Sequence, residues 1–214
     1  MNTNSKATVI LCYGDSNTRG NTPQGDRYPA DVRWTGLLQA QLGEDFYIIE
    51  EGLGGRTTAL DDLTEIYGKN GKTYLLPCLY SHNPIDIVIL MLGTNDVKER
   101  FRQSPEEISR NIEDLVKMIL EIGSNNSNKS PKIILLSPPL VDESVPNSQI
   151  NYKGAEEKSK QLASFYQEIA HKYDCEFIDI AKIIQPSKID GLHLEPEAHK
   201  VIADTLFATL KKIV

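Results

Sequence analysis

Two short segments of the sequence hold residue types that together could attack a carbonyl group. Residues 14–17 read Gly-Asp-Ser-Asn and follow an apolar run, so Ser16 would be exposed in a turn at the end of a strand. Residues 190–193 read Asp-Gly-Leu-His. A gap of three positions in a tight loop can place the Asp190 carboxylate beside Nδ1 of His193, which leaves Nε2 free to accept a proton from a serine hydroxyl. The two segments thus offer a nucleophile, a general base and an acid that orients the base.

Two further segments offer hydrogen-bond donors for the oxyanion that such an attack creates. Residues 52–55 hold three glycines in four positions, which allows a positive φ and a close approach of backbone to ligand, with the Gly55 N–H as donor. Residues 93–96 read Gly-Thr-Asn-Asp, and the Asn95 side-chain amide is the other candidate. Each of the segments could also be a local turn capped by Ser, Asn or Asp. Together they place a nucleophile, two oxyanion donors and an Asp–His pair on four loops at one sheet edge, and because chance coincidence of all four is the less economical account, the catalytic interpretation is favoured.

The pattern of apolar residues predicts the strands and helices that would position these residues. Strand-like runs cover residues 8–13, 46–50, 85–92, 132–137 and 176–180. Helical spacing covers residues 31–42, 105–122, 152–173 and the stretch from about 198 to the C-terminus. Ser104 and Glu107 form a capping box before the second of these helices, and Gly123 suits its end. Strands that alternate with helices predict a three-layer α/β/α domain with a parallel sheet, with its site beyond the carboxyl ends of the strands.

Composition limits the class of protein. The 214 residues suit a single domain over residues 1–214. The formal net charge of −7 disfavours nucleic acid as a partner, and no apolar run reaches the length of a membrane span. Neither nucleic acid nor a membrane is therefore expected as a partner. Three cysteines without a CxxC pair argue against a disulfide framework or a zinc ribbon. The polar N-terminus lacks the features of a signal peptide, which predicts a cytoplasmic location.

The four segments resemble the motifs of the SGNH (GDSL-type) hydrolases, a family named for Ser, Gly, Asn and His. The matching positions here are Ser16, Gly55, Asn95 and His193. The first block usually reads Gly-Asp-Ser-Leu, and Asn17 stands in its last position as a tolerated variant. More specific similarity to the arylesterase/acyltransferase branch is found at residues 50–53, 56–58, 61–62, 74–79 and 91–98. The resemblance extends from about residue 10 to the C-terminus.

The resemblance implies a flavodoxin-like sheet of five parallel strands, catalysis without a cofactor or metal, and a homo-oligomer. It implies a serine esterase acting on short-chain or acetyl esters of small molecules, with acyl transfer to an alcohol as a further outcome. The catalytic residues would be Ser16, Asp190 and His193. The oxyanion would be held by the backbone N–H groups of Ser16 and Gly55 and by the Asn95 amide.

Three other functions fit parts of the same pattern. A carbohydrate O-acetyl esterase would use the same residues on a sugar acetate. A non-catalytic ligand-binding module could keep the fold without the reaction. A flavodoxin-like or nucleotide-binding protein would need a phosphate-binding loop after the first strand, where Asp15 would repel a phosphate.

Overall fold

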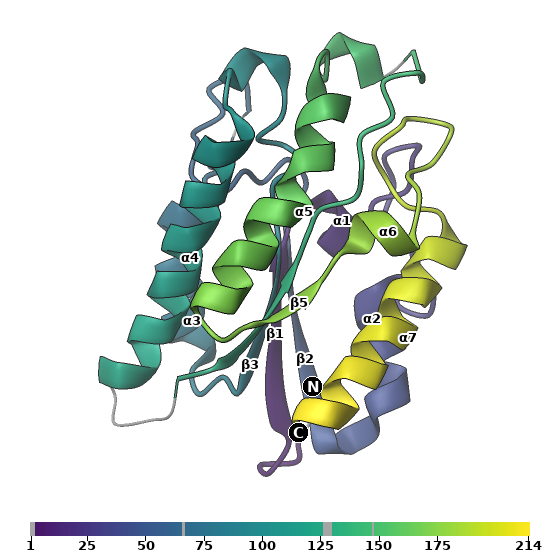
Figure 1. Ribbon diagram of the computed structural model, residues 1–214. Helices are drawn as coiled ribbons and strands as arrows, with labels where there is room; N and C mark the ends of the chain where they lie inside the picture. The colour runs from purple at the N-terminus through teal and green to yellow at the C-terminus, as the bar shows by residue number, and fades with distance from the viewer. Residues whose placement is uncertain (1–2, 66, 126–129, 147) are drawn as a thin grey trace.

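Five parallel strands form the centre of the protein: β1 (Thr8–Gly14), β2 (Phe46–Gly52), β3 (Ile87–Met91), β4 (Lys132–Leu136) and β5 (Glu176–Ile178). Their order across the sheet is β2-β1-β3-β4-β5. The structure is a computed structural model that describes residues 3–65, 67–125, 130–146 and 148–214 (Figure 1). The predicted α/β fold with a five-stranded parallel sheet is confirmed.

Helices cover both faces of this sheet, as Figure 1 shows. The described residues form α1 (Ser16–Arg19), α2 (Trp34–Leu42), α3 (Gly71–His82), α4 (Pro105–Asn125), α5 (Ala155–Lys172), α6 (Ile180–Ile183) and α7 (Pro196–Ile213). Short 3₁₀ turns lie at Gly43–Asp45, Glu99–Phe101 and Ser148–Ile150. Side chains of α3, α4 and α5 pack in one apolar cluster, and side chains of α2 and α7 pack in another.

The strands divide their side chains between the two clusters. Leu11 and Tyr13 of β1 lie in the cluster with α3, α4 and α5, while Ile10 and Cys12 lie in the cluster with α2 and α7. All four side chains are fully buried. Because successive side chains of a strand point to opposite faces, a strand covered on both sides must be apolar throughout. Each such aliphatic side chain contributes about 1.5–3 kcal/mol by leaving water.

Several element boundaries differ from the prediction. Residues 61–83 lack a clear helical pattern, yet they contain α3, which begins after an Asn70 side chain that accepts a hydrogen bond from the Thr73 N–H at 3.2 Å. The sequence does not predict this helix because it contains Gly71 and Pro77, and both residue types disfavour helices. The last strand ends at Ile178, since α6 begins two residues later. Helix α4 passes the predicted stop at Gly123 and ends at Asn125.

The start of α4 agrees with the predicted capping box. The Ser104 hydroxyl accepts from the Glu107 N–H at 3.2 Å, and the Glu107 carboxylate accepts from the Ser104 N–H at 2.8 Å. Two backbone donors at the helix start are thereby satisfied.

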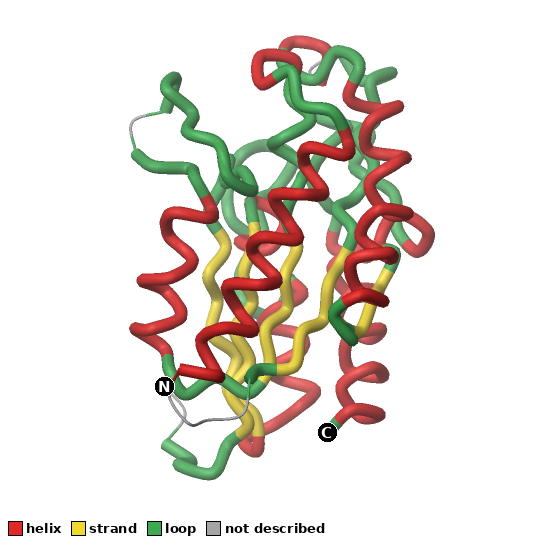
Figure 2. Tube along the Cα trace, turned by 60° about the vertical axis from the view of Figure 1, so that its left-hand side comes forward, coloured by secondary structure: helices red, strands yellow, loops and turns green. Residues whose placement is uncertain are grey.

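Loops that follow the strands gather at one end of the sheet, at the top of Figure 2. The strand order reverses direction at β1 and β3, and ligands of open parallel sheets bind beyond the strand ends at such a point. Among the described helices, none combines the length and the apolar character that a bilayer crossing requires.

Candidate active site

The turn after β1 places Ser16 at the start of α1. The Asp15 carboxylate accepts a hydrogen bond from the Asn17 N–H at 2.9 Å and so caps the short helix. The Asn17 carbonyl accepts from the Trp34 indole N–H at 3.0 Å, and the Asn17 amide donates to the Leu192 carbonyl at 3.3 Å. Asp15 thus fills the local capping role that the sequence allowed. Asn17 ties the serine turn directly to the loop that carries the histidine.

His193 is held by Asp190 in the geometry that the spacing predicts. The distance from His193 Nδ1 to Asp190 Oδ2 is 2.5 Å, and the other carboxylate oxygen accepts from the backbone N–H groups of Leu192 and His193, each at 3.0 Å. Burial would raise the pKa of Asp190, but these hydrogen bonds outweigh it and lower the pKa. The carboxylate is therefore charged at neutral pH, and it orients the imidazole with Nδ1 as the protonated nitrogen.

Gly191 makes this turn possible. Its φ is 74°, in the left-handed region that favours glycine. A Cβ at this position would lie 2.3 Å from the backbone oxygen of Asp142, so a larger residue would displace the loop.

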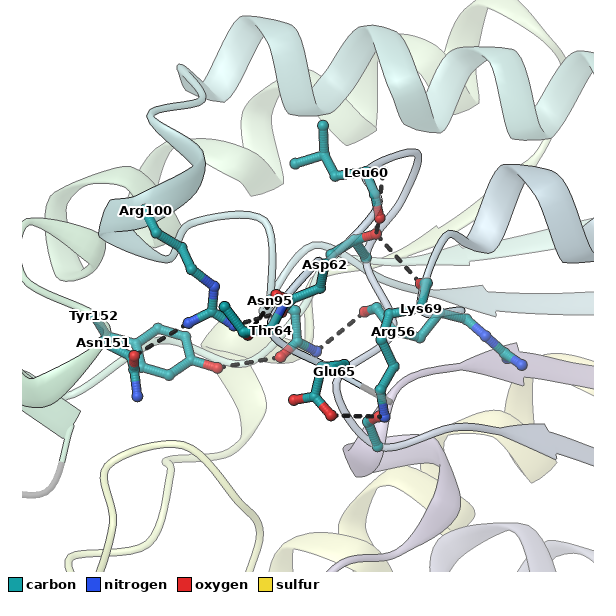
Figure 3. Close-up of polar contacts among 12 residues, drawn as sticks. Arg56, Leu60, Asp62, Thr64, Glu65, Lys69, Asn95, Arg100, Asn151 and Tyr152 are labelled. Atoms are coloured by element: carbon teal, nitrogen blue, oxygen red, sulfur yellow. Dashed lines mark hydrogen bonds and ion pairs between the residues drawn. The ribbon is translucent and has the colours of Figure 1, made fainter. Parts of the chain in front are cut away.

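The Asn95 amide is fixed on both sides by neighbours that the motif does not contain (Figure 3). Its nitrogen donates to the Arg56 carbonyl at 3.0 Å, and its oxygen accepts from the Tyr152 hydroxyl at 3.2 Å. One N–H of the amide is left to bind another acceptor. Arg56 is itself buried, with a guanidinium N–H donating to the Gly14 carbonyl at 2.9 Å and the group stacked 4.3 Å from the centroid of the Tyr13 ring.

Gly55 and Ser16 each present a backbone N–H that donates to no acceptor within the described part of the chain. The φ of Gly55 is 80°, so this position also requires the left-handed backbone. The structure brings all the predicted residues together: Ser16, Gly55, Asn95 and His193 line one hollow of about 280 Å³, and Asp190 lies behind His193.

A polar network holds the loop at residues 62–65 (Figure 3). The Arg100 guanidinium forms an ion pair with the buried Asp62 carboxylate and donates to the Asn151 side chain at 3.1 Å. The Thr64 hydroxyl also donates to Asp62, at 2.7 Å. Burial raises the pKa of Asp62, yet Arg100 and Thr64 outweigh burial and lower it to about 2. The network fixes the loop next to Glu65, which lines the hollow.

Sequence reasoning gave no role in the site to several side chains that line the hollow. Tyr152, Lys98 and Glu65 line it together with the predicted residues. Lys98 is 7% exposed, and burial lowers its pKa. No motif gives these positions a role: Tyr152 falls at the start of a predicted helix, and Lys98 ends the 91–98 segment and opens a short charged run. Only the folded chain brings them beside Asn95.

Asp96 gives the protein a testable pH dependence of stability. The carboxylate is fully buried and accepts hydrogen bonds from the Thr58 N–H and, at 2.5 Å, from its hydroxyl, but burial prevails and raises the pKa of Asp96 to about 6. The folded state therefore holds this proton more tightly than the unfolded state. The resulting stabilisation is complete below about pH 4 and is lost as the pH rises through 6.

Asp96→Asn removes this titration. We expect the free energy of unfolding of the variant, relative to the unmodified chain, to rise between pH 4 and pH 7 by at most about 3 kcal/mol, since each pKa unit is worth about 1.4 kcal/mol. Urea unfolding at both pH values measures the difference. A difference that is independent of pH would show that Asp96 titrates normally.

The chain is similar to known proteins over nearly its whole length. The model of the GDSL-like lipase/acylhydrolase family matches residues 12–201. An aryl esterase from M. smegmatis is 38% identical, with a TM-score of 0.89 over 97% of this chain and 100% of its own. A carbohydrate acetylesterase from Sinorhizobium meliloti is 36% identical, with the same TM-score and coverage.

A curated relative is similar over part of its length. An acetylxylan esterase from Xylanibacter ruminicola is 24% identical over 96% of this chain, which spans 43% of that relative. The chain thus covers less than half of this larger protein. The match to the family and the full-length likeness to the two esterase structures lead to one conclusion: the chain belongs to the GDSL-like lipase/acylhydrolase family of ester hydrolases.

Proposed function

We propose that the chain is a serine esterase that hydrolyses short-chain or acetyl esters of small molecules through an acyl-enzyme on Ser16. The observation that carries the proposal is the single hollow that Ser16, Gly55, Asn95 and His193 line, with His193 held by Asp190 at 2.5 Å. A nucleophile, an oriented base and converging N–H donors are the parts that acyl transfer requires.

In the proposed mechanism, Ser16 Oγ attacks the ester carbonyl while Nε2 of His193 accepts its proton. The charge that develops on the carbonyl oxygen is held by the backbone N–H groups of Ser16 and Gly55 and by the free N–H of Asn95. His193 then returns the proton to the leaving alcohol. Water, or an acceptor alcohol, attacks the acyl-enzyme, with His193 acting again as base. Asp190 stabilises the imidazolium that forms in each half of the reaction.

The size of the hollow supports a small acyl group. Its volume of about 280 Å³ lies just below the range of about 300–1,000 Å³ that is typical of sites for drug-sized ligands. Polar side chains line it, among them Asn21, Lys98 and Asn151, and they suit a hydroxylated alcohol better than a long acyl chain. The chemistry needs no metal or cofactor.

A second candidate is a carbohydrate O-acetyl esterase that uses the same residues. Two of the proteins to which the chain is similar, a carbohydrate acetylesterase and an acetylxylan esterase, favour it. The polar lining of the hollow is compatible with a sugar as the alcohol.

A panel of p-nitrophenyl esters from acetate to palmitate, with phenyl acetate and acetylated xylose beside it, tests both candidates. We expect kcat/KM to be highest for acetate and to fall with chain length. Preference for acetylated xylose over phenyl acetate would favour the carbohydrate esterase. Adding an acceptor alcohol measures transfer against hydrolysis. If no ester is turned over and a serine-reactive phosphonate does not label Ser16, both esterase proposals are wrong. The alternative of a non-catalytic ligand-binding module would then be favoured.

Removal of an oxyanion donor has an expected signature. Asn95→Ala should lower kcat on p-nitrophenyl acetate by about 10²–10³ and change KM little, because the oxyanion exists only in the transition state. Steady-state kinetics gives both constants. Tyr152→Phe is the informative companion, since it keeps the amide but removes the hydroxyl that orients it, and its loss should be smaller. A higher KM with an unchanged kcat in Asn95→Ala would assign the amide to substrate binding instead.

We also propose that the chain forms a homo-oligomer in the cytoplasm and binds no nucleic acid. The support for these points is the resemblance to the arylesterase branch, the composition and the net charge of −7. Light scattering after size-exclusion chromatography measures the oligomeric state.

A further inference from the structure

A second cluster of reactive side chains lies outside the candidate active site, between β2 and α3. Glu51 comes from the end of β2, and Cys78 and His82 lie four residues apart on α3. Residues at this spacing share one face of a helix. One possible ligand atom from each residue, namely a carboxylate oxygen, the thiol sulfur and an imidazole nitrogen, lies within 4.8 Å of the other two.

We propose that Glu51, Cys78 and His82 form a binding site for one divalent cation of borderline hardness, such as Zn²⁺. Thiolate, imidazole and carboxylate are the ligands that Zn²⁺ takes in proteins, at about 2.0–2.3 Å each. The mixture of a soft ligand with nitrogen and oxygen ligands disfavours Mg²⁺ and Ca²⁺, which prefer oxygen alone. Three protein ligands leave a fourth tetrahedral position for water or an added molecule.

The surroundings of the cluster provide a route for an ion and support for a ligand. Glu51 lines a hollow of about 630 Å³, together with Tyr74 and Pro77. The Tyr74 hydroxyl donates to the second oxygen of the Glu51 carboxylate at 3.3 Å, so it would orient that ligand. Cys78 is buried, whereas Glu51 and His82 are half-buried and close the cluster toward solvent.

An ordinary hydrogen bond between His82 and Glu51 accounts for only part of this arrangement. The distance from His82 Nε2 to Glu51 Oε1 is 2.8 Å, and this contact alone would fasten the end of α3 to β2. It does not involve the Cys78 thiol, whose sulfur lies within 4.8 Å of the same carboxylate and imidazole groups. The Arg56 guanidinium, which donates to the Glu51 carbonyl, opposes a cation. A thiolate and a carboxylate supply two negative charges against it, with the thiol proton passing to water when the metal binds.

Titration of the reduced, metal-free full chain with Co²⁺ tests the site. We expect a single ion to bind with visible d–d bands of a four-coordinate ion and a near-ultraviolet band from thiolate-to-cobalt charge transfer. Zn²⁺ should displace Co²⁺ and abolish both sets of bands. Zn²⁺ should also raise the melting temperature, because it binds the folded state. Absence of the charge-transfer band would overturn the proposal.

Variants identify the ligands. Cys78→Ala should lose the charge-transfer band, and His82→Gln should weaken Co²⁺ binding by at least about tenfold, since even indirect partners of metal ligands are worth about 10–100-fold. Cys175→Ala changes the half-buried thiol that lies outside the cluster, and it should bind Co²⁺ as the unmodified chain does. A charge-transfer band that survives in Cys78→Ala would place the metal elsewhere. These readouts are spectroscopic, so they stand or fall separately from the proposed esterase activity.

Discussion

Replacing Ser16 with alanine should lower kcat for p-nitrophenyl acetate by about a millionfold, the loss typical of removing a nucleophile that acts with a histidine. The remaining rate would come from the oxyanion donors at Gly55 and Asn95, which polarise the carbonyl for attack by water. Initial rates at saturating ester, with enzyme concentrations high enough to detect slow turnover, measure the difference.

The Ser16 variant has a matched control in the same chain. Ser164 is exposed on α5, and Ser164→Ala should keep the activity and the phosphonate labelling of the unmodified chain. Ser16→Ala should lose both while it keeps the same far-ultraviolet circular dichroism and melting temperature, because no side-chain hydrogen bond of Ser16 is lost within the described residues. Near-normal activity in Ser16→Ala would mean that another group is the nucleophile.

The parts of the site that the sequence predicts are those that local geometry determines. Asp190 and His193 lie three positions apart, and Gly191 between them supplies the positive φ that turns one toward the other. Ser16 follows a strand of buried residues, so its place beyond the sheet edge follows from the apolar pattern. The order of strands and helices then brings these segments to one edge.

The parts that the sequence does not predict depend on contacts between distant residues. Tyr152 reaches Asn95 across 57 positions, and Asn95 reaches the Arg56 carbonyl across 39. No sequence pattern pairs either partner with Asn95, so the orientation of the amide is a property of the fold. The cluster at Glu51 could not be predicted from the sequence for a related reason. Its other members, Cys78 and His82, lie on α3, and the glycine and proline in that helix disrupt its helical pattern.

Asp190→Asn tests the role of the acid while it preserves the shape of the side chain. The carboxylate accepts the Nδ1–H of His193 at 2.5 Å, but an asparagine can present its N–H₂ group there instead. His193 would then carry its proton on Nε2, which could no longer accept the Ser16 proton. We expect kcat on p-nitrophenyl acetate to fall by about 10⁴ with little change in KM, as happens when a triad histidine is held in the wrong tautomer.

The control for this loss is a second acid on a neighbouring loop. Asp142 pairs with Lys188 at 2.6 Å and does not contact the His193 ring. Asp142→Asn should therefore leave kcat within about twofold of the unmodified chain. The fold should also tolerate this change, because an exposed ion pair is worth only about 0–1 kcal/mol. Unfolding by urea should separate the two effects, because Asp190→Asn should lose activity far beyond any loss of stability. Should Asp190→Asn retain kcat within about tenfold of the unmodified chain, a carboxylate would not be required at His193 Nδ1, since the tautomer argument demands a loss of about 10⁴.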